Sequence, residues 1–303
     1  PPRLPEEPVT QDHMDLAAAL QKIYEREFLY LVKKSKELTG TTNLCLGGGC
    51  AYNGVANALA YKYFDSVHVP FAPSDAGSAI GACLVNNPLS GYAFDNSCPY
   101  LGNEYSNKQI KHTLIRYKDK ISAKYFSHNS LVKETAKIID DQKIVAWFQG
   151  RMEFGARALG NRSILASPRD ASMRDKLNKV IKKREGFRPF APSVTAETAS
   201  KWFEIKQGVP YMNIVVNAKT DKFLAATHID GTCRVQTVDK HQNKLYYSLL
   251  KEIGKLSGAE VVLNTSFNLK DQTITRTPEQ AVERFINSDI DYMVIDKYLL
   301  SKK

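Results

Sequence analysis

The most informative part of this chain is a basic stretch: QGRMEFGARALGNRSILASPRD at positions 149–170, continued by KKREGFRPFAP at positions 182–192. Between Arg151 and Arg188 there are seven Arg and four Lys against two Glu and two Asp, a local net charge of +7. Glycines interrupt the stretch, so the backbone can bend and bring guanidinium groups together. The planar guanidinium fork donates paired hydrogen bonds to phosphate and carbamoyl oxygens. The stretch therefore predicts a partly enclosed anion site.

A basic surface helix that binds nucleic acid is the alternative interpretation of these charges. The arginines lie among apolar residues such as Phe154, Leu159 and Phe187, whereas a nucleic-acid-binding face is expected to be uniformly polar. This pattern favours the enclosed anion site, and binding of nucleic acid is not expected.

The whole chain has 303 residues and a formal net charge of +10, with 43% hydrophobic and 24% charged residues. These values are typical of a soluble globular protein of two domains. No segment is long and apolar enough to span a membrane, and the polar, proline-rich start is not a signal peptide. Five scattered cysteines without a CxxC pair indicate reduced thiols and a cytoplasmic location. The chain does not start with Met, so we expect a portion of a longer protein.

The hydrophobic pattern predicts two α/β units, joined by a connection rich in Gly, Pro, Asn and Tyr at positions 88–107. The first unit begins with a helix from Asp12 or Asp15 to Leu38, whose expected buried side carries Leu16, Leu20, Ile23, Phe28 and Leu31. It continues with a buried strand at 43–46, a helix at 51–61, a strand at 66–69 and a helix at 75–82. This αβαβα order is too short for a complete layered domain. The second unit is expected to contain a helix at 130–140, strands at 143–149, 212–216 and 261–263, a helix starting at Thr277 and a closing strand at 291–295.

Two segments of the first unit suggest ligand contacts. Gly47, Gly48 and Gly49 lie between a predicted strand and a helix, where a phosphate can approach backbone N–H groups, and Asn53 adds an amide. Tight packing of small residues explains the same pattern equally well. Asp75 lies where a helix begins, so it is either a helix cap or a metal ligand that needs partners from elsewhere.

In the second unit, Asn264, Ser266 and Asn268 place amide and hydroxyl groups at a strand end, where they suit an adenylate or a phosphate. His228 could act as an acid or a base, but a lone His of this kind is more often structural. No two of the six histidines are four residues apart, which argues against a metal site built from them. The sequence has neither a G-x-S-x-G elbow nor an evident Cys–His pair. It therefore indicates positioning and charge neutralisation rather than covalent catalysis.

These segments, taken in order, resemble the nodulation-type and antibiotic O-carbamoyltransferase family. The matching stretches are LCLGGGCAYNGVAN, APSDAGSAIGA, QGRMEFGARALGNRSILASPRD, KKREGFRPFAPSV, THIDGTCRVQTV, LNTSFN and the TPEQAV helix start. They extend from Asp12 to Ile295, nearly the whole chain. Two departures are Ala156, where the family has Pro, and Gly47, where Ala or a similar small residue is expected.

The resemblance implies a fold and a reaction. Residues 1–95 would be the C-terminal part of an actin/Hsp70-like (ribonuclease-H-like) lobe that binds nucleotide, a divalent metal ion (Fe or Mg) and the acceptor alcohol. A linker at 96–125 would lead to an α/β domain at 126–303, similar to threonylcarbamoyl-adenylate synthases, which makes carbamoyl-adenylate from carbamoyl phosphate and ATP. The carbamoyl group would then pass to a hydroxyl of the acceptor. The family's His pair at i,i+4 is missing from this chain, so we expect the activation site whole and the transfer site only in part.

The resemblance also implies roles for individual residues. Carbamoyl phosphate and ATP would be bound and polarised by Arg151, Arg157, Arg162, Lys183, Arg184 and Arg188. The nucleotide would contact Gly48, Gly49 and Asn53 in the first unit and Asn264, Ser266 and Asn268 in the second. Asp75 would be one metal ligand, with the others outside this chain.

Two other functions stay open. A threonylcarbamoyl-type tRNA-modifying enzyme predicts salt-sensitive tRNA binding. A non-catalytic nucleotide-binding module predicts that arginine substitutions leave activity unchanged. The acceptor of a carbamoyltransferase would be a small alcohol that the sequence does not identify, and a homodimer is compatible with the sequence.

Overall fold

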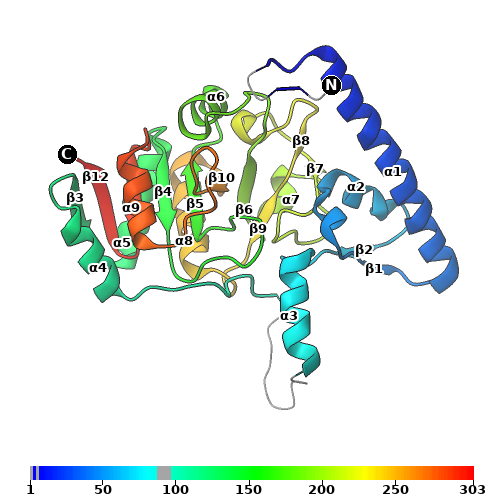
Figure 1. Cartoon of the computed structure of the whole chain (residues 1–303), viewed down its shortest axis with the longest axis horizontal. Coiled ribbons are helices and arrows are strands. Elements are labelled where there is room, and N and C mark those ends of the chain that lie inside the picture. Colours follow the sequence, from blue (N-terminus) through cyan, green and yellow to red (C-terminus); the bar gives the residue numbers. More distant parts are fainter. Residues whose placement is uncertain (1–2, 5–6, 87–96) are drawn as a thin grey trace.

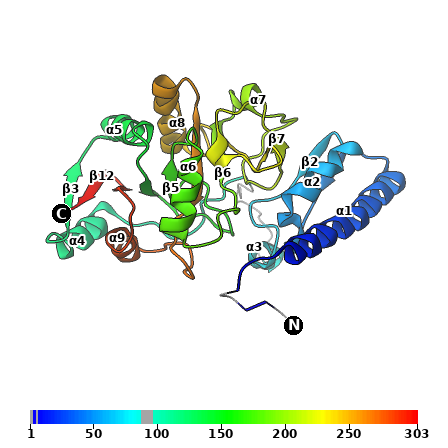
Figure 2. The same ribbon diagram turned by 90° about the horizontal axis from the view of Figure 1, so that it is seen from above.

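The chain folds into two α/β units that lie side by side (Figures 1 and 2). A computed structural model describes residues 3–4, 7–86 and 97–303. The C-terminal unit is built around a large sheet, and the smaller N-terminal unit carries the long helix α1 (Gln11–Thr39) along its outer side. The predicted mixed α/β fold class is confirmed.

An eight-stranded mixed sheet organises the C-terminal unit, in the order β3-β12-β11-β4-β5-β10-β6-β9. Its central strands are buried along most of their length, because helices or loops cover both faces. They are β4 (Val145–Phe148), β5 (Arg162–Ala166), β10 (Val261–Ser266) and β6 (Ala191–Thr195). The outer strands are β3 (Ile121–Tyr125), β12 (Tyr298–Lys302), β11 (Tyr292–Ile295) and β9 (Gln236–Val238).

Alternate side chains of β4 pack on opposite faces of the sheet, as strand geometry requires. Val145 and Trp147 meet one layer of helices, formed by α5 (His128–Asp140) and α8 (Lys244–Ser257). Ala146 and Phe148 meet the other core, which receives side chains from α4 (Asn107–Arg116), α6 (Ser172–Lys176), the helical turn Leu177–Lys182 and α9 (Pro278–Ile286). The layer that contains α4, α6 and α9 also contains the helical turn Leu177–Lys182, which leads into the predicted basic loop.

Several predicted elements of this unit are confirmed, and others need correction. The predicted helix at Thr277 is α9, with a capping box between Thr277 and Gln280 and with Pro278 in its first turn. The predicted linker at 96–125 is wrong from Asn107 onward, because α4 and β3 lie there and β3 pairs with β12 in the sheet. The boundary at 95/96 lies outside the described residues. The strand at 291–295 is β11, but β12 follows it and extends the sheet.

The segment predicted as a strand at 212–216 is largely irregular. Only its end joins β7 (Val216–Asn217), which pairs with β8 (Thr232–Cys233). The short helices α7 (Ala199–Trp202) and Leu224–Ala226 accompany this part of the chain. Across the described ranges, none of the helices is both long and apolar enough to cross a lipid bilayer.

The N-terminal unit has the predicted αβαβα order. After α1 come β1 (Asn43–Cys45), α2 (Gly54–Leu59) between 3-10 turns at Gly49–Tyr52 and Ala60–Lys62, β2 (Ser66–His68) and α3 (Asp75–Asn86). β1 and β2 form a two-stranded parallel sheet. The prediction that β1 is buried is wrong, since Asn43 and Cys45 are exposed.

The predicted buried side of α1 is also wrong for four of its five residues. Leu16, Leu20, Ile23 and Leu31 are 62%, 59%, 50% and 63% exposed. The helix instead turns the face that carries Phe28 and Val32 toward the core of its unit, where Val32 is buried and Phe28 half-buried. The apolar pattern identified the helix correctly, but it could not show which apolar face has a partner in this chain.

Candidate anion site

A polar pocket of about 530 Å³ lies between the end of β10 and the loop that follows the helical turn Leu177–Lys182. Five predicted residues come together in its lining: Lys183, Arg184, Arg188, Ser266 and Asn268. They come from two segments more than 75 residues apart, which the pairing of β10 with β5 and β6 brings together. The pocket also contains Lys182, which belongs to the quoted basic stretch but has no role in the predicted site.

A π-helical turn explains which lysine is enclosed. Leu177–Lys182 forms this turn, and Lys183 ends it in a left-handed conformation with a φ of 46°. Lys182 is only 6% exposed, and its Nζ donates to Ser266 O at 2.6 Å and to Asn268 Oδ1 at 2.7 Å. Such wide turns are common at functional sites, and α-helical periodicity does not foresee them. Lys182 therefore connects the end of β10 to the start of the basic loop through hydrogen bonds.

The electrostatics of Lys182 are unusual for a lysine. Burial, together with the nearby cations Arg184 and Arg284, lowers its pKa to about 7. An anion bound in the pocket would attract the Lys182 ammonium group and counter the charges of Arg184 and Arg284. Its binding would therefore favour protonated Lys182.

Asn178 orients the basic loop through hydrogen bonds to residues of that loop. This fully buried residue accepts a hydrogen bond from Arg184 Nε at 2.8 Å and donates one to Arg188 O at 2.9 Å. The Arg184 guanidinium also lies 4.9 Å from the centre of the Phe190 ring. These contacts fix Arg184 in place, and burial lowers its pKa. Asn178 thus acts through Arg184.

Arg234 extends the cationic cluster toward Arg157. Burial is the main cause that lowers the pKa of Arg234 to about 10, and the charges of Arg157 and Arg184 add to it. The Nε atoms of Arg157 and Arg234 are buried and have no hydrogen-bond partner in the part of the chain that the structure describes. Unpaired buried donors in a cluster of like charge are unfavourable unless an anion meets them. Sequence reasoning passed over Arg234, although it lies in the quoted THIDGTCRVQTV segment.

Arg162 lies outside this cluster. Its side chain is fully buried, and the Nη atoms donate to four backbone carbonyls, those of Gln149, Gly150, Asn161 and Asn103. The guanidinium lies 3.7 Å from the centre of the Phe148 ring. Its Nη donors are committed to the backbone, so the structure gives Arg162 a structural place and does not bring it to the pocket.

Arg151 is likewise placed away from the pocket. It is exposed, and it donates to Leu101 O at 3.0 Å and to Gly102 O at 3.2 Å. Arg157 is the member of the central stretch that stays near the cation cluster. It lies over Tyr52 at 5.2 Å and has one long hydrogen bond, 3.5 Å, to Tyr52 O.

Glu153 shapes the loop that presents Arg157. It is 5% exposed, and its Oε1 accepts backbone hydrogen bonds from Leu159 at 2.7 Å, Asn161 at 2.9 Å and Arg162 at 3.2 Å. Gly160 completes the turn with a φ of +105°, where a Cβ atom would lie 2.3 Å from the Tyr246 ring. Sequence reasoning recognised the glycines as flexible points but missed the carboxylate that closes the loop.

The predicted nucleotide contacts fall into two groups. Asn264 is buried under the site and donates to Ala158 O at 3.2 Å and Gln236 Oε1 at 3.0 Å, so it supports the residue next to Arg157. In the N-terminal unit, Asn53 caps α2 through Ala56 N–H and donates to Gln21 Oε1 at 2.9 Å. Gly48 and Gly49 are exposed in the turn before it. These three residues do not line the polar pocket.

Asp75 is exposed at the start of α3. Throughout the described residues, no three His, Cys, Asp or Glu side chains gather in a way that could hold a metal ion. The residues that the structure describes therefore do not by themselves complete the metal site that the family resemblance implies. His228 is half-buried and shares a hydrogen bond of 2.9 Å with Thr232 Oγ1, which is consistent with its structural interpretation.

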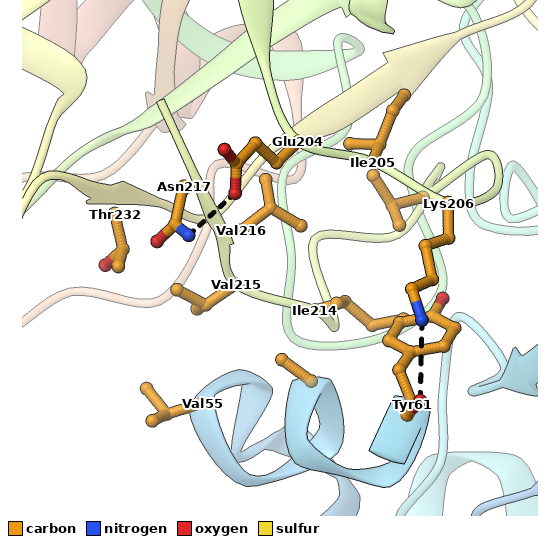
Figure 3. A pocket seen from close by; sticks show the side chains of 12 residues that line it. Val55, Tyr61, Glu204, Ile205, Lys206, Ile214, Val215, Val216, Asn217 and Thr232 are labelled. Atoms are coloured by element: carbon orange, nitrogen blue, oxygen red, sulfur yellow. Dashed lines mark hydrogen bonds between the residues drawn. The ribbon is translucent and has the colours of Figure 1, made fainter. Parts of the chain in front are cut away.

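A second, more apolar cleft of about 310 Å³ separates α2 from the segments around β7 (Figure 3). Val55 and Tyr61 lie on one side, and Val215 lies across from them. Glu204 accepts a hydrogen bond from Asn217 at 2.8 Å on the far side. No predicted site residue lines this cleft.

Comparisons with known proteins show the family of the chain. A family model described as carbamoyltransferase C-terminus matches residues 136–302, and one described as carbamoyltransferase N-terminus matches residues 2–84. The chain belongs to the carbamoyltransferase family. The first of these matches contains the whole polar pocket apart from Arg3.

Three relatives show how much of a family member this chain represents. Nodulation protein NolNO of Sinorhizobium fredii and nodulation protein NolO of Bradyrhizobium diazoefficiens are each 38% identical over 98% of this chain, which covers 45% and 56% of their lengths. A protein of Synechocystis sp., sll1178, is 38% identical over the whole chain, which covers 54% of it. The chain thus spans about half the length of these relatives.

Proposed function

We propose that this carbamoyltransferase-family chain activates carbamoyl phosphate with ATP, forming carbamoyl-adenylate in the polar pocket. The observation that carries the proposal is the convergence of Lys182, Arg184 and Arg188 in the lining of the pocket. Arg234 and Arg157, whose buried Nε atoms have no partner among the described residues, extend this cluster from Arg184. Such a cluster suits the phosphates of ATP and of carbamoyl phosphate, which carry several negative charges.

The reaction balances in three steps. Water releases phosphate from carbamoyl phosphate and leaves carbamate. A carbamate oxygen then attacks the α-phosphorus of ATP and displaces pyrophosphate. The acceptor hydroxyl finally attacks the carbamoyl carbon, loses its proton and releases AMP. The chain's own residues contribute charge stabilisation at the phosphates, since the developing negative charge meets fixed cations in a partly enclosed site.

The acceptor is proposed to be a small alcohol, and ATP and carbamoyl phosphate are the proposed co-substrates. The metal of the family stays a prediction that depends on ligands beyond Asp75. A homodimer and a cytoplasmic location also stay predictions.

The test is pyrophosphate release, or exchange of labelled pyrophosphate into ATP, by the 303-residue chain. Release should require both ATP and carbamoyl phosphate. Arg184→Met should lower the rate at least a hundredfold, while Lys201→Met, at an exposed side chain of α7, should leave it unchanged. Activity without carbamoyl phosphate, or equal activity in both variants, would contradict the proposal. Tight tRNA binding with a steep salt dependence would favour the tRNA-modifying alternative instead.

A further inference from the structure

An apolar stripe runs along the outer face of α1. We define it by Leu16, Leu20, Ile23, Leu31 and Leu38, which are 62%, 59%, 50%, 63% and 75% exposed. The spacing keeps these side chains on one face, because an α-helix turns once in about 3.6 residues. A helix with a second apolar face normally buries it, and a row of exposed leucines marks an interaction surface. The face that carries Phe28 and Val32 already packs on the N-terminal unit, so the stripe is additional to it.

The sheet of the same unit has one open edge. Leu46 N–H donates to His68 O at 2.9 Å and Ser66 N–H donates to Thr42 O at 3.3 Å, so alternate residues of β1 face β2. The backbone groups of Asn43 and Cys45 consequently point to the other side of β1. A parallel pair of three-residue strands is rare without further strands, because parallel sheets are normally covered and extended.

The opposite edge is closed by a side chain. Gln207 Oε1 accepts a hydrogen bond from Val67 N–H at 3.0 Å, and Gln207 Nε2 donates to Val67 O at 2.7 Å. The amide satisfies the outward backbone groups of β2 as a neighbouring strand would. The sheet can therefore grow only beside β1.

The relatives are longer than this chain, and their additional length suggests what covers the α1 stripe and the open β1 edge. The chain covers 54%, 45% and 56% of three relatives, so each contains a further part of comparable size. We propose that the α1 stripe and the β1 edge bind a polypeptide equivalent to that further part. It adds a strand beside β1 and covers the stripe with apolar side chains. This inference does not depend on the proposed reaction, because binding can be measured without activity.

The probe is the part of the Synechocystis relative outside the stretch that matches this chain, and the equivalent part of NolO, each produced as a separate polypeptide. Mixing either one with the 303-residue chain should give a one-to-one complex in light scattering and titration calorimetry. Amide exchange at Asn43 and Cys45 should slow at least tenfold in the complex, since both N–H groups then enter a sheet. The double variant Leu20→Glu, Leu31→Glu should weaken binding at least tenfold without changing the circular dichroism spectrum, because both side chains are already exposed.

The matched control is the double variant Leu224→Glu, Ile229→Glu, which adds the same two charges at side chains that are 43% and 87% exposed in the other unit. It should leave binding unchanged. The proposal is overturned if neither probe binds, or if the stripe variant and the control bind alike. It is also overturned if the chain alone forms a dimer that the stripe variant abolishes, since a second copy would then be the occupant.

Discussion

Replacing Arg162 by Met tests whether this arginine belongs to the framework or to the anion site. The substitution keeps an unbranched apolar stem but removes the donors to four backbone carbonyls and the guanidinium that stacks on Phe148. A buried group left without its partner costs about 1–3 kcal/mol, and breaking a buried charged network costs about 3–5 kcal/mol in total. We therefore expect the free energy of unfolding to fall by about 3–5 kcal/mol, which is a large part of the stability of a domain.

The matched change is Arg157→Met, in the same loop. Arg157 has one hydrogen bond of 3.5 Å and a half-buried side chain, so we expect a loss of less than about 1 kcal/mol of stability. Its effect should appear in function. The rate of pyrophosphate release should fall at least a hundredfold under conditions in which the variant is fully folded. Urea unfolding of both variants, followed by circular dichroism, measures the first quantity. If Arg162→Met were as stable as the parent chain and Arg157→Met were strongly destabilised, the assignment of the two arginines would be refuted.

Three further changes give distinct outcomes. Glu153→Ala should lower the free energy of unfolding by about 2–4 kcal/mol, because three buried N–H groups lose their acceptor, and Glu153→Gln should recover most of that loss in urea unfolding. Phosphate affinity, measured by calorimetry, should fall as the pH rises above about 7, where free Lys182 loses its proton, and Lys182→Met should flatten that profile. In the ligand-free chain, the unfolding free energy should rise between pH 7 and 10.5, since only the unfolded lysine binds a proton there. Gly160→Ala should destabilise the chain by about 2 kcal/mol or more in thermal unfolding, because the left-handed backbone and the Tyr246 ring both exclude a Cβ atom.

Local signals were sufficient for much of the fold. The Thr277–Gln280 capping box and Pro278 gave the start of α9, and the charge of the basic stretch gave the polar pocket. These features are encoded within a few residues, so a pattern can show them. The helix α1 was found for the same reason, but its buried face depends on neighbours that come from elsewhere in the fold.

The roles of single basic residues were harder to predict. Arg157 and Arg162 are five positions apart in one glycine-rich loop, yet one approaches the cation cluster and the other is enclosed by backbone carbonyls. The Glu153 carboxylate and the pairing of β5 with β4 decide that difference, and both are contacts of the folded chain. The prediction named Lys183, but Lys182 is the enclosed lysine. The π turn changes the direction in which successive side chains point, and α-helical spacing does not foresee that change.

The amide of Gln207 on β2 has a consequence for how this protein can aggregate. Endless stacking of sheets, as in a filament, requires two open edges on every copy, so that each addition creates a new place to add. Here one side chain closes an edge, and any strand that joins beside β1 occupies the other. When two copies pair through their β1 strands, each copy presents only its closed β2 edge, so growth stops at the pair and cannot seed a fibre through this sheet. A single glutamine thereby protects a sheet of only two short strands from open-ended polymerisation.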